Sequence, residues 1–116
     1  MVTKLKNNLE YIKYIRKKMN ENLPEWNEDT ADYEGQPNNN FGISFVKNSY
    51  KFQLIKDRGL LEFNLYIKGK GVYIDNLYNS ILEEIPEQNA KWRLSLCVEL
   101  IDFYIVFLKK YYDSII

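Results

Sequence analysis

The chain has 116 residues, the length of one ordinary domain. Apolar residues make up 46% of it and charged residues 28%, a globular composition that excludes a wholly disordered chain. Lys and Arg balance Asp and Glu at sixteen each, so no net field favours nucleic acid or an anionic membrane. The absence of histidine removes the usual general base and the commonest zinc ligand, and one cysteine cannot form an internal disulfide. We therefore expect a single cytoplasmic domain, residues 1–116, without metal or cofactor and without nucleic-acid or membrane contacts.

The N-terminal third predicts a helix followed by a long loop. Apolar side chains recur at helical spacing over residues 3–20, with Thr3 as the expected N-cap and Pro24 just past the end. Residues 23–40 show no period and are rich in turn formers, which predicts a loop. Long ordered loops in compact domains tend to carry function, so this segment is a candidate site.

From Phe41 onwards apolar and polar residues alternate with the period of a half-buried strand. Two short segments with turn composition, Lys47–Ser49 and Asp57–Gly59, separate the alternating runs. The pattern predicts an antiparallel meander of three strands at about residues 41–46, 50–56 and 60–68. One face of this sheet is aromatic and aliphatic and must be covered.

Two helices are expected after the strands. A short helix is expected at about residues 74–85, with Asp75 as a first-turn acid or N-cap and Pro86 ending it. A long one at about residues 89–113 carries a wide apolar stripe and is expected at the centre of the core. The predicted fold class is α+β, with an antiparallel sheet of about three strands packed against an N-terminal helix and two C-terminal helices.

Signals for catalysis are weak. Glu99 and Asp102 lie one turn apart in the long helix, where burial raises the pKa of a carboxyl group. We favour the alternative that both point into water or pair with Lys or Arg of the first helix, an arrangement common on helix surfaces. Cys97 has no cationic neighbour in sequence and is expected to be a core residue. We therefore predict that the protein is not an enzyme.

The charge distribution is the most distinctive feature. No Lys or Arg occurs between Lys18 and Lys47, a segment that contains six acidic residues, and the aromatics Trp26 and Tyr33 are interleaved with these acids. Two interpretations stay open: a solvated acidic loop that bridges to the basic first helix, or an acidic, aromatic surface that docks on a basic partner. Metal binding by the acidic residues is disfavoured because Asp29, Asp32 and Glu34 do not match an EF-hand spacing. The candidate partner-binding residues are Glu25, Trp26, Glu28, Asp29, Asp32, Tyr33 and Glu34, with Asp57 and Arg58 of the second turn as an alternative contact.

One stretch carries a resemblance. Residues 50–63, YKFQLIKDRGLLEF, form a strand, an Asp-Arg-Gly turn and a second strand, and this resembles small bacterial immunity proteins. In those proteins a short helix and a C-terminal helix follow, the latter ending in a pattern similar to FLKKYY at residues 107–112. The similarity covers about the C-terminal two-thirds of the chain. It implies a cytoplasmic protein that binds and neutralises a cognate toxin delivered by a neighbouring or sister cell, and it carries over no contact residue.

Three hypotheses follow. The first is a non-catalytic inhibitor, an immunity protein that covers the active site or substrate surface of a toxin, with a nuclease as one candidate. The second is a structural or regulatory module that pairs with itself as a homodimer through an apolar patch of Trp26, Tyr33, Tyr66 and Tyr73. The third is a hydrolase that uses Glu99 and Asp102.

Overall fold

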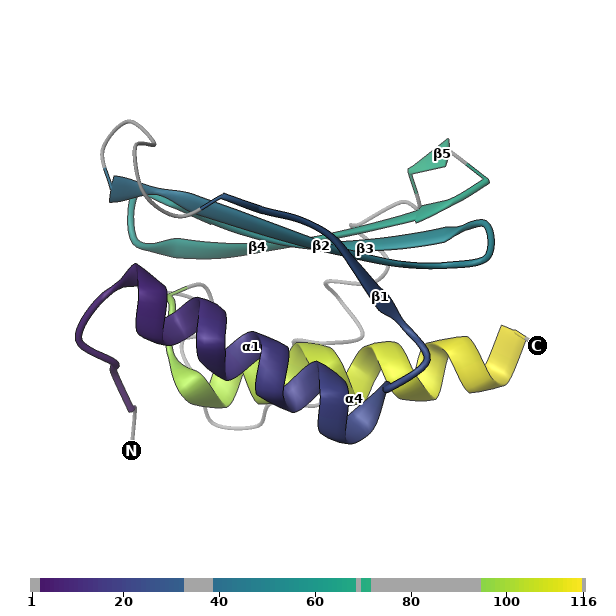
Figure 1. Ribbon diagram of the computed structural model, residues 1–116, viewed down its shortest axis with the longest axis horizontal. Helices are drawn as coiled ribbons and strands as arrows, with labels where there is room; N and C mark the ends of the chain where they lie inside the picture. Colours follow the sequence, from purple (N-terminus) through teal and green to yellow (C-terminus); the bar gives the residue numbers. More distant parts are fainter. Residues whose placement is uncertain (1–2, 33–38, 69, 72–94, 116) are drawn as a thin grey trace.

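The structure, a computed structural model, describes residues 3–32, 39–68, 70–71 and 95–115. In these residues an antiparallel sheet packs against two helices, which confirms the α+β class (Figure 1). The sheet has four longer strands and a two-residue fifth, instead of about three, in the order β1-β2-β3-β4-β5. The elements are α1 Asn8–Asn22, β1 Asn27–Asp32, β2 Phe41–Lys47, β3 Tyr50–Asp57, β4 Leu60–Ile67, β5 Lys70–Gly71 and α4 Val98–Ile115. The helix expected at about residues 74–85 lies outside the described residues.

The central meander of β2, β3 and β4 matches the three strands predicted from alternation to within one residue. Its register places Phe45, Phe52 and Leu65 side by side across the three strands, on the face that packs against the helices. The turn between β3 and β4 consists of Arg58 and Gly59, which both have positive φ values, +53° and +81°. Turns of this kind match the twist of the flanking strands, and glycine adopts them without steric cost.

Helix α1 begins five residues later than predicted. Its N-cap is Asn7, whose side chain accepts a hydrogen bond of 2.9 Å from the backbone N–H of Glu10. The carboxylate of Glu10 in turn accepts from the backbone N–H of Lys6 at 2.8 Å. The expectation that Thr3 caps the helix is therefore wrong, because Asn7 and Glu10 supply a reciprocal cap nearer the apolar stripe.

The predicted loop at residues 23–40 contains an edge strand. Strand β1 pairs antiparallel with β2, and its register shifts between Glu28 and Thr30, which is a β-bulge at Asp29. The sequence NEDTAD has neither apolar alternation nor strand-favouring composition. The loop prediction is wrong for these six residues because tertiary pairing with β2, rather than local propensity, makes the strand.

Helix α4 begins at Val98, so the prediction of a helix from residue 89 is wrong for residues 95–97, while residues 89–94 lie outside the described part. The backbone just before α4 bonds to other segments instead. The N–H of Leu96 donates to the carbonyl of Gly59 at 3.0 Å, and Ser95 forms an isolated bridge with Leu60. These contacts hold the residues before α4 beside the β3–β4 turn, so the helix begins only at Val98.

The core lies between one face of the sheet and the two helices, which run side by side in the same direction beneath it (Figure 1). Phe63 of β4 is at its centre, with ring centroids 5.1 Å from both Phe52 and Tyr104. Ile12 and Ile15 of α1 are fully buried in the same cluster. Neither helix in the described ranges has the length and apolar character needed to cross a membrane.

Candidate functional site

Three of the acidic residues singled out in the sequence, Glu28, Asp29 and Asp32, lie on β1, at the edge of the sheet. Residues Asn27 to Thr30 are exposed, and within the described residues the strand pairs with β2 alone. The bulge directs neighbouring acidic side chains to different faces. Glu28 bonds to Arg16 of α1 on the helix side, whereas Asp29 pairs with Lys51 of β3 at 3.5 Å. Asp32 ends the strand, and Tyr33 and Glu34 lie outside the described residues.

Glu25, Glu28 and Asp29 each have a basic partner within the chain. The guanidinium of Arg16 donates two hydrogen bonds to Glu28, at 2.7 and 2.9 Å, and Lys47 pairs with Glu25. This is the bridge to the basic helix that one interpretation expected for Glu28. Such solvent-accessible pairs contribute little to stability, so a partner's cations compete with them at little cost. We name the exposed residues Asn27–Thr30 of β1, with Glu25 before them, the β1 edge.

Trp26 does not belong to this exposed surface. Its side chain is 6% exposed and packs edge-on against the ring of Tyr112 in α4, with centroids 5.4 Å apart. The expectation of a surface aromatic is therefore wrong for Trp26. An aromatic flanked by acidic residues is compatible with either location, and only the packing of α4 against the start of β1 decides it.

The second predicted contact, Asp57 and Arg58, lies at the β3–β4 turn. The carboxylate of Asp57 accepts from the amide of Asn40 at 3.3 Å, and Asn40 accepts from the backbone N–H of Arg58 at 3.0 Å. The Arg58 side chain is 82% exposed. Register pairs Asp32 with Gly42 and Lys56 with Phe41, so this turn and the end of β1 lie at the same end of the sheet.

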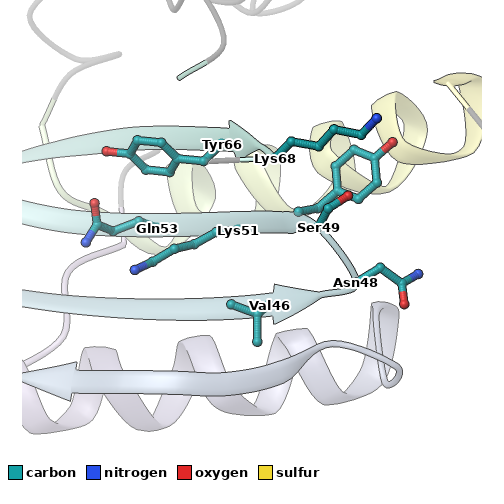
Figure 2. A pocket seen from close by; sticks show the side chains of 8 residues that line it. Val46, Asn48, Ser49, Lys51, Gln53, Tyr66 and Lys68 are labelled. Carbon is teal, nitrogen blue, oxygen red and sulfur yellow. The ribbon is translucent and has the colours of Figure 1, made fainter. Parts of the chain in front are cut away.

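A groove of about 470 Å³ lies on the sheet face opposite the helices, and sequence reasoning missed it (Figure 2). Figure 2 shows Lys51 and Gln53 of β3 beside Tyr66 of β4, with Lys68 at one end. The side chain of Gln53 donates a hydrogen bond to Ser44 at 3.3 Å and accepts one from Asn64 at 3.4 Å. These three residues form a polar row across β2, β3 and β4. The lining consists of Val46, Asn48, Ser49, Tyr50, Lys51, Gln53, Tyr66 and Lys68.

The groove has the chemistry of a binding surface. Its two ammonium groups, amides and hydroxyls suit hydrogen bonding to a polar or acidic group. Among the described residues, its lining includes no carboxylate or thiol that would serve as a base or nucleophile. The sequence signal for this groove was the alternation in β3 and β4. The residues that alternate with the buried core residues are polar or aromatic, and they line the opposite face of the sheet. Lys51 also pairs with Asp29, so the groove adjoins the β1 edge.

The carboxylates considered for catalysis both accept hydrogen bonds within the chain. The carboxylate of Glu99 accepts hydrogen bonds from the backbone N–H and the hydroxyl of Thr3, at 2.7 and 2.6 Å. Burial opposes ionisation of Glu99, but the bonds from Thr3 outweigh it and lower its pKa. Asp102 accepts from the hydroxyl of Tyr14 of α1 at 2.5 Å, and burial together with this bond raises the pKa of Tyr14. The expected pairing of both carboxylates with Lys or Arg of the first helix is not observed: Asp102 bonds to that helix through Tyr14, and Glu99 bonds to Thr3, which precedes the helix.

Cys97 is a fully buried core residue that directly precedes α4, rather than lying in mid-helix as predicted. Burial raises the pKa of its thiol, the opposite of what a reactive thiolate needs. Across the residues that the structure describes, no three side chains of the metal-binding types come together.

Comparisons with protein-family models, curated proteins and solved structures found no match to this chain. The functional argument therefore depends on the geometry of the β1 edge and the groove.

Proposed function

We propose that the protein is a non-catalytic inhibitor that acts in the cytoplasm, an immunity protein that binds a cognate bacterial toxin and covers its active site or substrate surface. The observation that carries the proposal is the β1 edge. Its exposed strand presents backbone donors and acceptors along the rim of the sheet, together with the carboxylates of Glu28 and Asp29. An edge strand is a ready template for pairing with another chain.

The electrostatics of the β1 edge favour a basic partner. Three carboxylates within five residues, Glu25, Glu28 and Asp29, line one rim, and their intramolecular pairs are exposed. Complementary charge accelerates encounter and suppresses wrong partners. A toxin that acts on a phosphate-bearing substrate has a cationic cleft, and an acidic strand placed against it keeps the substrate out.

The placement of the other reactive groups supports inhibition rather than turnover. Glu99 and Asp102 are occupied as acceptors for Thr3 and Tyr14, and Cys97 is enclosed in the core. The Asp-Arg-Gly turn on which the resemblance to immunity proteins depends forms the β3–β4 hairpin, the element expected of it. Its exposed Arg58 lies at the same end of the sheet as the end of β1.

The alternative of self-association through β1 or Trp26 gains no support from this geometry. Two copies paired along β1 would place acidic residues beside acidic residues, which is unfavourable. Trp26, one of the aromatics expected in a homodimer patch, is buried within its own chain. Light scattering at micromolar concentration is expected to give a monomer mass.

Charge reversal tests the proposal. The double variant Glu28→Lys, Asp29→Lys is expected to slow association with the product of the adjacent toxin gene about tenfold at low salt, and less at high salt, because screening weakens the field. Glu62→Lys is the matched control, since Glu62 is exposed on β4, away from the β1 edge. Surface plasmon resonance supplies the rate constants, and survival of toxin-expressing cells supplies the biological readout.

Two outcomes contradict the proposal. Binding by the wild type without protection of toxin-expressing cells excludes inhibition. Equal association rates for the double variant and the Glu62→Lys control remove the β1 edge as the contact and leave the groove or the Arg58 turn to be tested in the same assay.

A further inference from the structure

The groove on the sheet face opposite the helices combines cationic side chains with apolar surface. The register places Val46 of β2, Lys51 of β3 and Tyr66 of β4 side by side in one row across the strands. All three line the groove, and Lys68, which directly follows β4, lines one end of it. Within the part of the chain that the structure describes, no Asp or Glu contributes to the lining. The groove therefore has a positive potential, which attracts negatively charged groups.

The size of the groove and the direction of its lysines distinguish a chain segment from a small anion. Its volume of about 470 Å³ lies within the ~300–1,000 Å³ range of sites that enclose ligands of many atoms. Figure 2 shows the side chains of Lys51 and Lys68 pointing in opposite directions along the strands. A single anionic group meets one of these ammonium groups, whereas an extended segment with two separated acidic residues meets both.

Both lysines are available to such a segment. Lys68 is exposed, and among the described residues no ion pair includes it. Lys51 pairs with Asp29 at 3.5 Å, and the two side chains are 40% and 44% exposed. Because ion pairs this accessible to water contribute little to stability, an incoming carboxylate replaces Asp29 at little cost.

The acidic neighbour of the groove favours a peptide over a nucleic acid. The β1 edge adjoins the groove through the contact between Asp29 and Lys51. A nucleic acid strand carries a negative charge at every phosphate, so the carboxylates of the β1 edge repel it. A peptide places its carboxylates at the two lysines only, and an apolar side chain between them contacts Val46 and the ring of Tyr66.

We propose that the groove is a docking site for an extended acidic segment of a partner protein, which pairs with Lys51 and Lys68 through two carboxylates. The proposal does not depend on the immunity function, because the β1 edge selects a basic surface and the groove selects an acidic one. The two surfaces share the ion pair between Asp29 and Lys51, so a substitution of Asp29 affects them in opposite directions.

Titration of the ¹⁵N-labelled full chain with a synthetic peptide tests this site, with nuclear magnetic resonance as the readout. The peptide Ac-Glu-Ala-Leu-Ala-Glu-NH₂ places its two acidic residues about 13 Å apart along the backbone when it is extended. It is expected to move the backbone amide resonances of Lys51, Tyr66 and Lys68 to a plateau and to leave those of α1 in place. The matched neutral peptide, Ac-Gln-Ala-Leu-Ala-Gln-NH₂, is expected to bind about tenfold more weakly, because it forms neither ion pair.

Single substitutions assign the contacts. Lys51→Gln and Lys68→Gln are each expected to weaken binding of the acidic peptide about threefold, because each removes one ion pair. Lys17→Gln is the matched control, since Lys17 is exposed on α1, beneath the other face of the sheet. Asp29→Asn is expected to tighten the acidic peptide by about the same threefold factor, because Lys51 loses its internal partner, and to slow association of a basic partner with the β1 edge.

The proposal is overturned if the acidic and neutral peptides bind equally, or if Lys51→Gln and Lys68→Gln bind the acidic peptide as tightly as Lys17→Gln does. Acetate that moves the same three resonances at the same concentration would assign the groove to a small anion. A single-stranded thymidine octamer that binds more tightly than the peptide would assign it to a nucleic acid, and either result contradicts the proposal. A failure of toxin binding leaves these titrations unchanged, so the two proposals are tested separately.

Discussion

At the scale of single residues, buried and half-buried polar groups connect distant parts of the chain. The carboxylate of Glu99 receives both donors of Thr3, and the carbonyl of Thr3 accepts from the N–H of Val98, so the N-terminal segment is bound to the start of α4. The ammonium of Lys4 adds a hydrogen bond to the carbonyl of Leu96. From the sequence alone, a carboxylate in an apolar helix is a candidate general base. Only the three-dimensional structure shows that Thr3 donates hydrogen bonds to Glu99.

The pKa of Glu99 gives a pH-dependent prediction. The pKa of Glu99 in the folded protein is below the ordinary value of 4.5. The folded state therefore stabilises the ionised carboxylate relative to the protonated form. The stabilisation is complete above pH 4.5 and is lost as the pH falls through the lowered pKa. Glu99→Gln is therefore expected to lower the unfolding free energy by about 1 kcal/mol at pH 7, and by less at pH 3. Urea denaturation at the two pH values measures both differences.

Glu62→Gln serves as the control for Glu99, because Glu62 is exposed on β4. It is expected to change stability by less than about 0.5 kcal/mol at either pH. A cost for Glu99→Gln that is equal at pH 3 and pH 7 would mean that the Thr3 bonds do not require the charge.

At the scale of elements, the sequence predicts what depends on local pattern. The alternation in residues 41–67 defines β2, β3 and β4, since a sheet with one buried face requires it. The sequence of β1 has no such alternation, and this strand forms because its backbone pairs with the edge of β2. Likewise the start of α4 is set by bonds of residues 95–98 to Gly59 and Thr3, which no local rule contains.

The β3–β4 turn provides a prediction with an internal comparison. Gly59 has φ +81°, a conformation that alanine adopts at a cost of about 1 kcal/mol or more, although no atom lies within 4 Å of its added methyl group. Gly59→Ala is expected to lower the unfolding free energy by that amount. Gly42 is the second residue of β2, and a methyl group added there meets only an ordinary contact at 3.9 Å, so Gly42→Ala is expected to be nearly neutral. Thermal and urea denaturation of the two variants check the difference, and equal costs would place the strain elsewhere.

At the scale of the whole molecule, the candidate site was half predictable. The charge gap between Lys18 and Lys47 predicts an acidic surface, and Glu28 and Asp29 from this segment are exposed on β1. One interpretation expected a bridge to the first helix, which Glu28 and Arg16 form, but the pairing of Asp29 with Lys51 was not expected, since Lys51 comes from a strand two positions away in the sheet. The groove arises from residues of neighbouring strands that the sheet brings together, so no single segment of the sequence predicts it.

The sheet face, α1 and α4 share one buried cluster, which extends from Ile12 through Phe63 to Tyr112. A core without a division predicts one cooperative unfolding transition. We expect Trp26 fluorescence, which reports the contact between β1 and α4, and far-ultraviolet circular dichroism, which reports both helices, to give the same midpoint. The measurement is made in a Trp92→Phe background so that one indole is observed.

Removing the central ring sharpens this test. Phe63 contacts Phe52 of β3 and both Tyr104 and Phe107 of α4, so Phe63→Ala is expected to cost about 3–5 kcal/mol. Because the cluster is continuous, the two probes should shift together and keep a common midpoint. Tyr66→Phe, on the opposite face of the same strand, is expected to leave both midpoints in place. A fluorescence transition that precedes the loss of helix in Phe63→Ala would mean that β1 and the end of α4 unfold apart from the remainder.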